Sequence, residues 1–431
     1  MKTKLFTVLL ITAFFSAPAL FGQVQHSFLT GNTMTIFKTD ADKLQDVNDY
    51  AEVDINKAYI MAGSHYDTNT NAFRGIRGGV ATNLNSLYLG ILYDGYFWDG
   101  DADKVTVNGN RQAGADTGFN FDNRFNVLFG KKSFGGIAVS LGFSNLNFDK
   151  DANDIADTTT TTRRGIINFG AMWGKNFARS KGTLKPELGF MTLINMNENK
   201  TKTGNTTTVD GHGPSSLMLY LTSEYVFSRE GQHQTTLNFG DIPWIYFPYE
   251  NKGPPKTKFE SEFYNTLFFE LKQVYDITGS LSVGYLAGLN LAINKPGGLV
   301  KDTHRDVFEL GFLPRLSLAL TYKASEKFLF NTGVRLGSLY PDEIVTEGTL
   351  GQGMPPFTNL NTADSFGLFY RNDNNAGTKT STWDFLPFRG AWGIGMLWQP
   401  DRIFSADFSV NSDFNSTPGA FNFNVLFALN L

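Results

Sequence analysis

The feature that most constrains the fold of this chain is a period of two in its apolar residues. It is clearest in the last eleven residues, where Phe, Val and Leu at the odd positions from Phe421 to Leu431 alternate with mostly polar residues. Successive side chains of a β-strand point to opposite faces of a sheet, whereas a helix repeats every 3.6 residues. The chain is therefore predicted to end in an amphipathic strand. Residues 119–129 repeat the pattern, with Phe119, Phe121 and Phe125 on one face.

The segments between these strands alternate between short and long. The short ones are two- to four-residue turns such as Asn85-Ser86, whereas the long ones are rich in Asn, Thr, Asp and Gly and occupy 99–117, 145–163, 195–213 and 339–380. An antiparallel up-and-down sheet with tight turns at one end and loops at the other produces this alternation. Tandem soluble sandwiches give no reason for it. We count about 16 strands; 14 remains open, because the first two strands have the weakest alternation and residues 54–84 could instead belong to a plug.

Composition agrees with a sheet that is apolar on one side and wet on the other. The 431 residues include 40 Phe and 44 Gly but no Cys. Hydropathy is mildly polar overall, which excludes a helical membrane protein. The absence of Cys excludes disulfides, thiolate metal sites and thiol catalysis, and a net charge of −4 is too small to indicate nucleic acid as a partner.

Three parts of the chain are expected. Residues 1–22 have the pattern of a signal peptide, with Lys2 and Lys4 before an apolar run and small residues at its end. Residues 23–52 are weakly patterned and are predicted to form either a periplasmic segment or a plug. Residues 53–431 are predicted to form one barrel, because no later stretch is long and apolar enough for a membrane helix.

On this pattern the chain resembles bacterial outer-membrane β-barrels of the porin and FadL-like transport-channel type. The resemblance implies a location in the outer membrane, contact with its lipid, and recognition of the strand Phe421–Leu431 by the barrel-assembly machinery. Aromatic residues near strand ends would form girdles at the membrane interfaces. The six tryptophans are assigned to these girdles: Trp98, Trp173, Trp244, Trp383, Trp392 and Trp398.

If the apolar rows face lipid, the opposite rows line a wet interior. Counting from the short turns brings several charged residues of these rows to similar heights in the lumen. They are Arg124, Arg315, Arg335 and Arg389, with Glu187 and Glu270 as acidic partners. Either the arginines form a basic constriction that faces acids on the far wall, or they pair with carboxylates of loops or of a plug. The sequence leaves both interpretations open.

Nothing in the sequence indicates catalysis, and no enzyme activity and no cofactor are predicted. The five His are scattered without ligand spacing. The run Asp99-Gly-Asp101-Ala-Asp103 begins like a calcium loop but has Lys104 and Asn110 where that loop requires Gly and Glu. No metal site is therefore assigned.

Three functions are weighed. The first is a channel for passive diffusion of small polar or charged solutes, as the polar interior rows suggest. The second is a FadL-like transporter of hydrophobic molecules, which requires an apolar pocket near the outer loops, for which the candidates are Tyr88, Tyr96, Tyr264, Phe268, Trp383 and Phe385. The third is an adhesin or structural barrel that acts through its loops. Solute identity, oligomeric state and loop partners are left open.

Overall fold

The computed structural model consists of strands and the turns between them. It describes residues 59–67, 72–85, 87–99, 106–107, 110–111, 119–153, 158–196, 198–203, 206–210, 215–251, 257–295, 306–337, 367–375, 378–386, 390–401, 403–413 and 422–430. The predicted signal segment and the segment 23–52 lie outside these residues. Within the described ranges, no helix has the length and apolar character needed to cross a bilayer.

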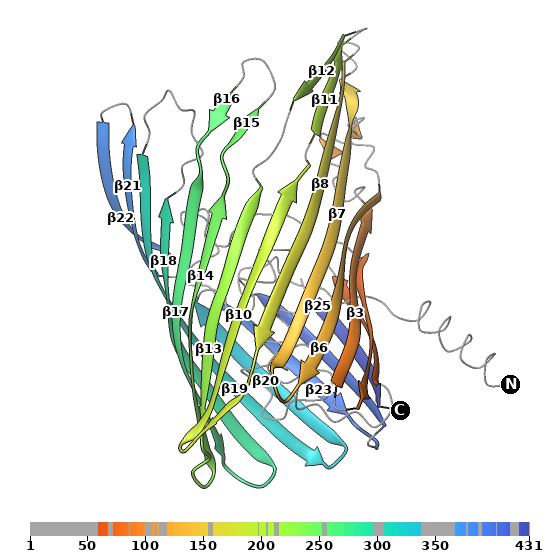
Figure 1. Cartoon of the computed structure of the whole chain (residues 1–431), viewed down its shortest axis with the longest axis vertical. Coiled ribbons are helices and arrows are strands. Elements are labelled where there is room, and N and C mark those ends of the chain that lie inside the picture. The colour runs from red at the N-terminus through yellow and green to blue at the C-terminus, as the bar shows by residue number, and fades with distance from the viewer. Residues whose placement is uncertain are drawn as a thin grey trace, which may run out of the picture.

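Long antiparallel strands form the wall of a cylinder, and Figure 1 shows them tilted around it. In order around the wall they are β1 (Tyr59–Asp67), β2 (Ala72–Leu84), β3 (Leu87–Asp99), β6 (Phe119–Lys131), β7 (Gly135–Asn153), β8 (Thr158–Gly174), β10 (Gly182–Asn195), β13 (Ser216–Phe227), β14 (His233–Tyr246), β17 (Glu262–Asp276), β18 (Leu281–Lys295), β19 (Asp306–Ser325), β20 (Phe328–Gly337), β23 (Gly390–Trp398), β24 (Phe404–Asp413) and β25 (Asn422–Asn430). These sixteen described strands agree with the predicted number.

The last strand returns to the first. β25 pairs with β1 in an antiparallel register from Tyr59 opposite Asn430 to Asp67 opposite Asn422. β1 in turn contacts β2, and both belong to the same large sheet. The terminal amphipathic strand is therefore hydrogen-bonded on one side to β24 and on the other to β1, as the closure of an up-and-down barrel requires.

The remaining described strands are short or extend the wall. They are β4 (Thr106–Val107), β5 (Asn110–Arg111), β9 (Phe177–Arg179), β11 (Glu198–Thr203), β12 (Thr206–Asp210), β15 (Tyr249–Asn251), β16 (Thr257–Phe259), β21 (Gly367–Asn375) and β22 (Thr378–Leu386). β11 pairs with the start of β8, and β21 pairs with the start of β19. The wall therefore rises as hairpins on the long-loop side, where Figure 1 shows β11 and β12 at its upper edge.

These extensions correct three predicted loops. Residues 145–163 hold the end of β7 and the start of β8, residues 195–213 hold β11 and β12, and β21 and the start of β22 lie in 339–380. The five threonines at 158–162 are part of β8. Thr is β-branched and favours extended backbone. Its side chain carries no apolar signal, so a strand beyond the membrane has no hydrophobic alternation to reveal it.

The short turns lie where the sequence placed them. Asn85 takes a positive φ of 48° between β2 and β3, as the predicted Asn85-Ser86 turn requires. Gly231, with a φ of 62°, occupies the turn between β13 and β14. Aromatic rings contact one another beside two other short turns, where Phe328 begins β20 and Trp398 ends β23, with ring centroids 6.3 Å apart. This pair lies where an aromatic girdle would place it, and the girdles themselves stay a prediction.

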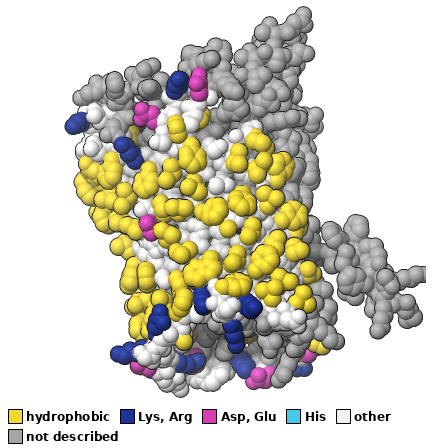
Figure 2. Space-filling model, viewed as in Figure 1, with side chains coloured by type: hydrophobic (Ala, Val, Ile, Leu, Met, Phe, Trp, Pro, Cys, Tyr) yellow, Lys and Arg dark blue, Asp and Glu magenta, His cyan; other side chains and the backbone are white. Residues whose placement is uncertain are grey.

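The outer surface of the wall is apolar through its middle. Large side chains such as Ile91, Phe125, Leu141, Phe269 and Leu316 are each more than half exposed. Figure 2 shows a broad band of hydrophobic side chains across the described part of the visible face, with most charged side chains above and below it. Exposed apolar surface of this extent marks contact with another apolar phase, and a band between two charged edges is what a bilayer requires. The chain is an outer-membrane β-barrel.

A candidate binding site on the inner wall

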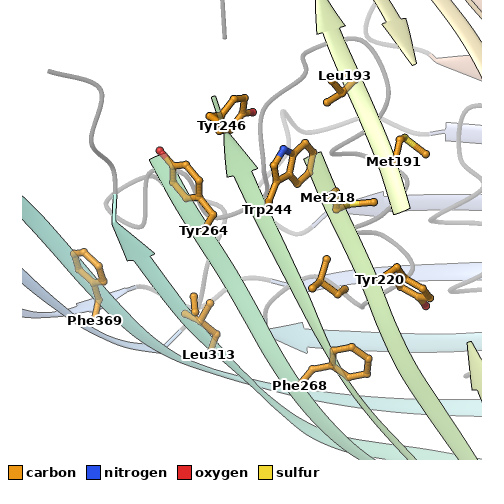
Figure 3. Close-up of a cluster of buried hydrophobic side chains, with 12 residues drawn as sticks. Met191, Leu193, Met218, Tyr220, Trp244, Tyr246, Tyr264, Phe268, Leu313 and Phe369 are labelled. Carbon is orange, nitrogen blue, oxygen red and sulfur yellow. The ribbon is translucent and has the colours of Figure 1, made fainter. Parts of the chain in front are cut away.

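The inner face of one side of the barrel carries a cluster of buried apolar side chains. The inner-wall cluster consists of Met191 and Leu193 of β10, Met218 and Tyr220 of β13, Ile242, Trp244 and Tyr246 of β14, Tyr264 and Phe268 of β17, Ala292 of β18, Leu313 of β19 and Phe369 of β21. Figure 3 shows these side chains on neighbouring strands, on one side of the sheet. All are at most 9% exposed.

The alternation within β17 establishes which face the cluster occupies. Phe263, Leu267 and Phe269 are exposed and belong to the outer band, whereas Tyr264 and Phe268 between them are buried. Neighbouring residues of a strand point to opposite faces. The buried row therefore points into the barrel, and Phe268 and Phe269 are adjacent residues on opposite sides of the wall.

Aromatic rings dominate the half of the cluster nearer the long loops. Trp244 and Tyr246 are stacked with centroids 6.1 Å apart, and Tyr264 meets Tyr246 edge to face at 5.9 Å. The hydroxyl group of Tyr264 donates to Glu262 at 2.7 Å. The indole nitrogen of Trp244 is buried without a hydrogen-bond partner in the structure. A buried indole N–H ordinarily has an acceptor, so this part of the cluster could hydrogen-bond a polar atom of a bound molecule.

A row of polar residues crosses the wall beside the cluster, on the side of the short turns. The register places these residues opposite one another in the order Lys185, Glu224, Asn238, Glu270, Gly288 and Arg315, from β10 to β19. We call this set the polar row. Lys185 and Glu224 are 3.5 Å apart, and the Asn238 amide donates to Glu270 at 2.9 Å. Glu270 also forms an ion pair with Arg315.

The ion pair between Glu270 and Arg315 is deeply buried. The two residues are 4% and 1% exposed, and β18 lies between their strands. β18 contributes Gly288 at this point, and a Cβ there would lie 3.1 Å from Arg315 Nε and 3.2 Å from Glu270 Cγ. The missing side chain therefore leaves the space through which the guanidinium group reaches the carboxylate.

The polar row and the cluster are adjacent. On the inner face of β17, Phe268 lies two residues from Glu270, on the long-loop side of it. Leu313 lies in the same way two residues from Arg315 on the inner face of β19. Above the cluster, Glu309 accepts from Asn294 at 3.3 Å and lies 3.7 Å from Arg371 of β21. The apolar cluster thus lies between two groups of paired polar residues.

The predicted constriction residues have different positions. Arg315 and Glu270 are brought together, but along one wall, two strands apart. Glu187 lies on the inner face of β10, opposite Thr222. Arg335 lies opposite Ser317, which is the next inner-face residue of β19 after Arg315. Arg124 lies opposite Asp94. Only the backbones of these two arginines are described, and Arg389 lies outside the described residues. The basic constriction stays a prediction.

The prediction that the interior rows form a wet lining is wrong for this wall, as is the assignment of Trp244 to a girdle. Trp244 is 1% exposed and belongs to the inner face. The sequence does contain a sign of this cluster that a period of two does not capture. Residues Leu217–Leu221 of β13 and Ile242–Phe247 around the end of β14 are apolar on both faces of the strand. When one strand of such a barrel is apolar on both faces, its outer face contacts lipid and its inner face contacts other apolar groups within the barrel.

Of the residues predicted to line an apolar pocket, some are buried and others are exposed. Tyr264 and Phe268 are members of the cluster, and Tyr88 on β3 is buried as well. Trp383 and Phe385 of β22 are 57% and 69% exposed. The side chain of Tyr96 lies outside the described set.

A groove of 480 Å³ lies on the opposite, lipid-facing side of the same wall. It is lined by Leu221, Phe239, Gly240, Asp241, Leu267, Phe268, Phe269, Leu289 and Leu291. Asp241 Oδ1 is buried there without a hydrogen-bond partner. Within the described residues, no group of three or more His, Cys, Asp or Glu could hold a metal ion.

Comparison with known proteins finds structural similarity at low sequence identity. No protein family matches the sequence, and no curated protein matches it. Among solved structures, a FadL homologue of Pseudomonas aeruginosa is 10% identical over 94% of this chain and 98% of its own, with a TM-score of 0.41. CdiB from Escherichia coli is 9% identical over 88% of this chain and 64% of its own, with a TM-score of 0.44. The CymD monoaromatic hydrocarbon channel is 7% identical over 96% of both chains, with a TM-score of 0.34. Similarity at this level is too remote to indicate a function.

Proposed function

We propose that this barrel is an outer-membrane channel for small hydrophobic molecules, and that the inner-wall cluster binds them during passage. The observation that carries the proposal is the position of the cluster. Apolar side chains on the outer face of a barrel are accounted for by lipid, but lipid does not account for a dozen buried apolar side chains on the inner face.

The composition of the cluster suits small ring compounds. Trp244, Tyr246 and Tyr264 present ring faces and edges close to one another, and aromatic pairs favour such offset and edge-to-face contacts. Met191 and Met218 add flexible thioether side chains, which adapt to differently shaped ligands. Sites for small molecules typically combine apolar walls with a few polar groups, and the polar row and Trp244 would supply the latter.

The binding test uses the adjacent pair Phe268 and Phe269. Toluene is titrated into the refolded barrel, and quenching of Trp244 is followed in a variant whose other five tryptophans are replaced by Phe. Phe268→Ala is expected to weaken binding by about tenfold, since it removes a ring from the cluster. Phe269→Ala, on the lipid-facing side, is expected to leave binding unchanged. Equal effects of the two substitutions, or no saturable quenching, would reject the proposal.

A second candidate is passive diffusion of small polar or charged solutes. It is favoured by the charged residues of the inner wall on the side of the short turns, including Lys185, Glu187 and Lys272. Planar-bilayer recording separates the two functions. A polar-solute channel would give steady open conductance steps in salt alone, whereas a hydrophobic-compound channel is expected to give few or none.

A further inference from the structure

We propose that Glu270 determines specificity in this barrel: by neutralising Arg315, it restricts the inner-wall cluster to uncharged molecules. The inference rests on the proposed function and names the class of ligand, neutral ring compounds that carry at most a hydroxyl or similar polar group. Hydrophobic anions and hydrophobic amines would be excluded.

The first step concerns the charge that a ligand meets beside the cluster. Arg315 is the basic residue of the polar row nearest to Leu313, at a spacing of two residues on the inner face of β19. An uncompensated arginine at this position would favour carboxylates, because its guanidinium group binds them with two parallel hydrogen bonds. Glu270, two strands away, is already the carboxylate that pairs with Arg315.

The second step concerns the strength of that compensation. Both side chains are almost completely buried, so water screens the ion pair weakly. Asn238 holds the other carboxylate oxygen of Glu270 at 2.9 Å. Gly288 leaves open the path between the partners. A ligand carboxylate would have to displace Glu270 from a pair that three strands hold in place, and would leave a buried carboxylate without its cation.

The third step concerns the balance of charge around the cluster. The polar row contains two basic residues, Lys185 and Arg315, and two acidic ones, Glu224 and Glu270. On the opposite side of the cluster, Arg371 lies 3.7 Å from Glu309 and 3.4 Å from Asp373. Neither group has a net positive charge among these residues. Arg315 and Arg371 are therefore each engaged by a carboxylate, and an anionic ligand gains no partner from these two cations.

The experiment compares three probes of similar size: benzyl alcohol, benzoate and benzylamine. Each competes with toluene in the Trp244 quenching assay at pH 7.5. The wild type is expected to prefer benzyl alcohol to each of the charged probes by at least about tenfold. Comparable binding of benzoate or benzylamine to the wild type overturns the inference, while saturable toluene binding leaves the proposed function standing. Absence of toluene binding overturns both.

Charge variants test the role of the pair itself. Glu270→Gln is expected to raise benzoate binding relative to benzyl alcohol by about tenfold, because Arg315 loses its counter-charge. Arg315→Gln is expected to raise benzylamine binding instead. The double variant Glu270→Gln/Arg315→Gln restores neutrality and should recover the wild-type order, which a purely structural role of the pair does not predict.

The control is Glu326→Gln, which removes a carboxylate from an ion pair with Lys323 at 2.9 Å in the turn between β19 and β20. It should leave the ratio of the three probes unchanged. If one single variant fails to fold, the other single variant and the double variant carry the comparison. Wild-type ratios in all of the folded variants would overturn the role of Glu270.

Discussion

Arg315 and Glu270 form an ion pair across an intervening strand that has no side chain at the point of crossing. Gly288 lies opposite both residues on β18, the strand that pairs with β17 on one side and with β19 on the other. Its position explains how two charges on alternate strands meet without bending the wall. Gly288 is thus part of the device that joins the pair, although it has no polar side chain of its own.

Gly288→Val is therefore expected to separate the pair. Its Cβ alone would lie 3.1 Å from Arg315 Nε and 3.1 Å from the carbonyl oxygen of Phe269. Overpacking of this kind costs about 1–3 kcal/mol of unfolding free energy. Urea unfolding in lipid vesicles measures the loss. Ala287→Val, the adjacent lipid-facing position, should cost much less; equal losses would contradict the role assigned to Gly288.

Gly240→Ala is expected to displace the ring of Phe268. A Cβ at Gly240 would lie 2.6 Å from Phe268 Cζ and 2.7 Å from the carbonyl oxygen of Leu221, and the backbone oxygen cannot move aside. The variant should lose about 1–3 kcal/mol of stability and bind toluene more weakly. Gly279→Ala is the control, since nothing lies within 4 Å of the added atom there. Unchanged binding by the Gly240 variant would show that the position of this ring is unimportant.

Asp241→Leu is expected to stabilise the barrel. Asp241 lies on the lipid-facing side, opposite Leu267 and in the groove with Phe239. A carboxylate on that face is unfavourable, and its replacement by an apolar residue should gain roughly 1 kcal/mol. The gain is measured by urea unfolding against Phe239→Leu, which changes no charge. A loss of stability would indicate that Asp241 has a partner in the membrane.

The turn between β23 and β24 should respond to acid. Asp401 Oδ1 accepts the backbone N–H groups of Phe404 and Ile403, both at 2.8 Å. These hydrogen bonds, that of Phe404 first, lower the pKa of the Asp401 carboxyl group below its ordinary 3.8. Since the folded-state pKa is the lower one, the stabilisation is complete above the unfolded-state pKa and is lost as the pH falls through the folded-state pKa.

Asp401→Ala tests this by melting temperature as a function of pH. The wild type should melt higher than the variant at pH 7, and the two curves should converge as the pH falls below about 4. Asp401→Asn keeps an acceptor without the charge and should lie between them. A constant difference between wild type and Asp401→Ala across the acid range would contradict the assignment.

The architecture was accessible from the sequence because the physics of a membrane barrel is periodic. Lipid on one side and water on the other impose a period of two, so the alternation in Phe119–Phe129 and Phe421–Leu431 predicts strands directly. The short turns follow from the need to reverse the chain, as at Asn85. Beyond the bilayer this constraint ends, so the sequence predicts a loop where β11 and β12 lie.

The interior site was only partly accessible for the same reason. Arg315 and Glu270 were selected as interior charges, but their pairing depends on the register at Gly288, which one sequence does not specify. Trp244 was assigned to a girdle because an aromatic residue near a strand end fits that role equally well. Residues that are apolar on the inner face add nothing to the alternation, so the alternation does not reveal the cluster, and the pairing of the strands does.

The most direct test of the inner-wall cluster as a binding site is photolabelling with a diazirine derivative of toluene in lipid vesicles. The modified residues are identified by mass spectrometry with and without excess toluene. We predict that labelling of Met218, Trp244 and Tyr264 is competed away by toluene, while labelling of lipid-facing Phe269 and Leu316 is not. Labelling confined to lipid-facing residues, or labelling of the cluster that toluene does not reduce, would contradict a binding site inside the barrel.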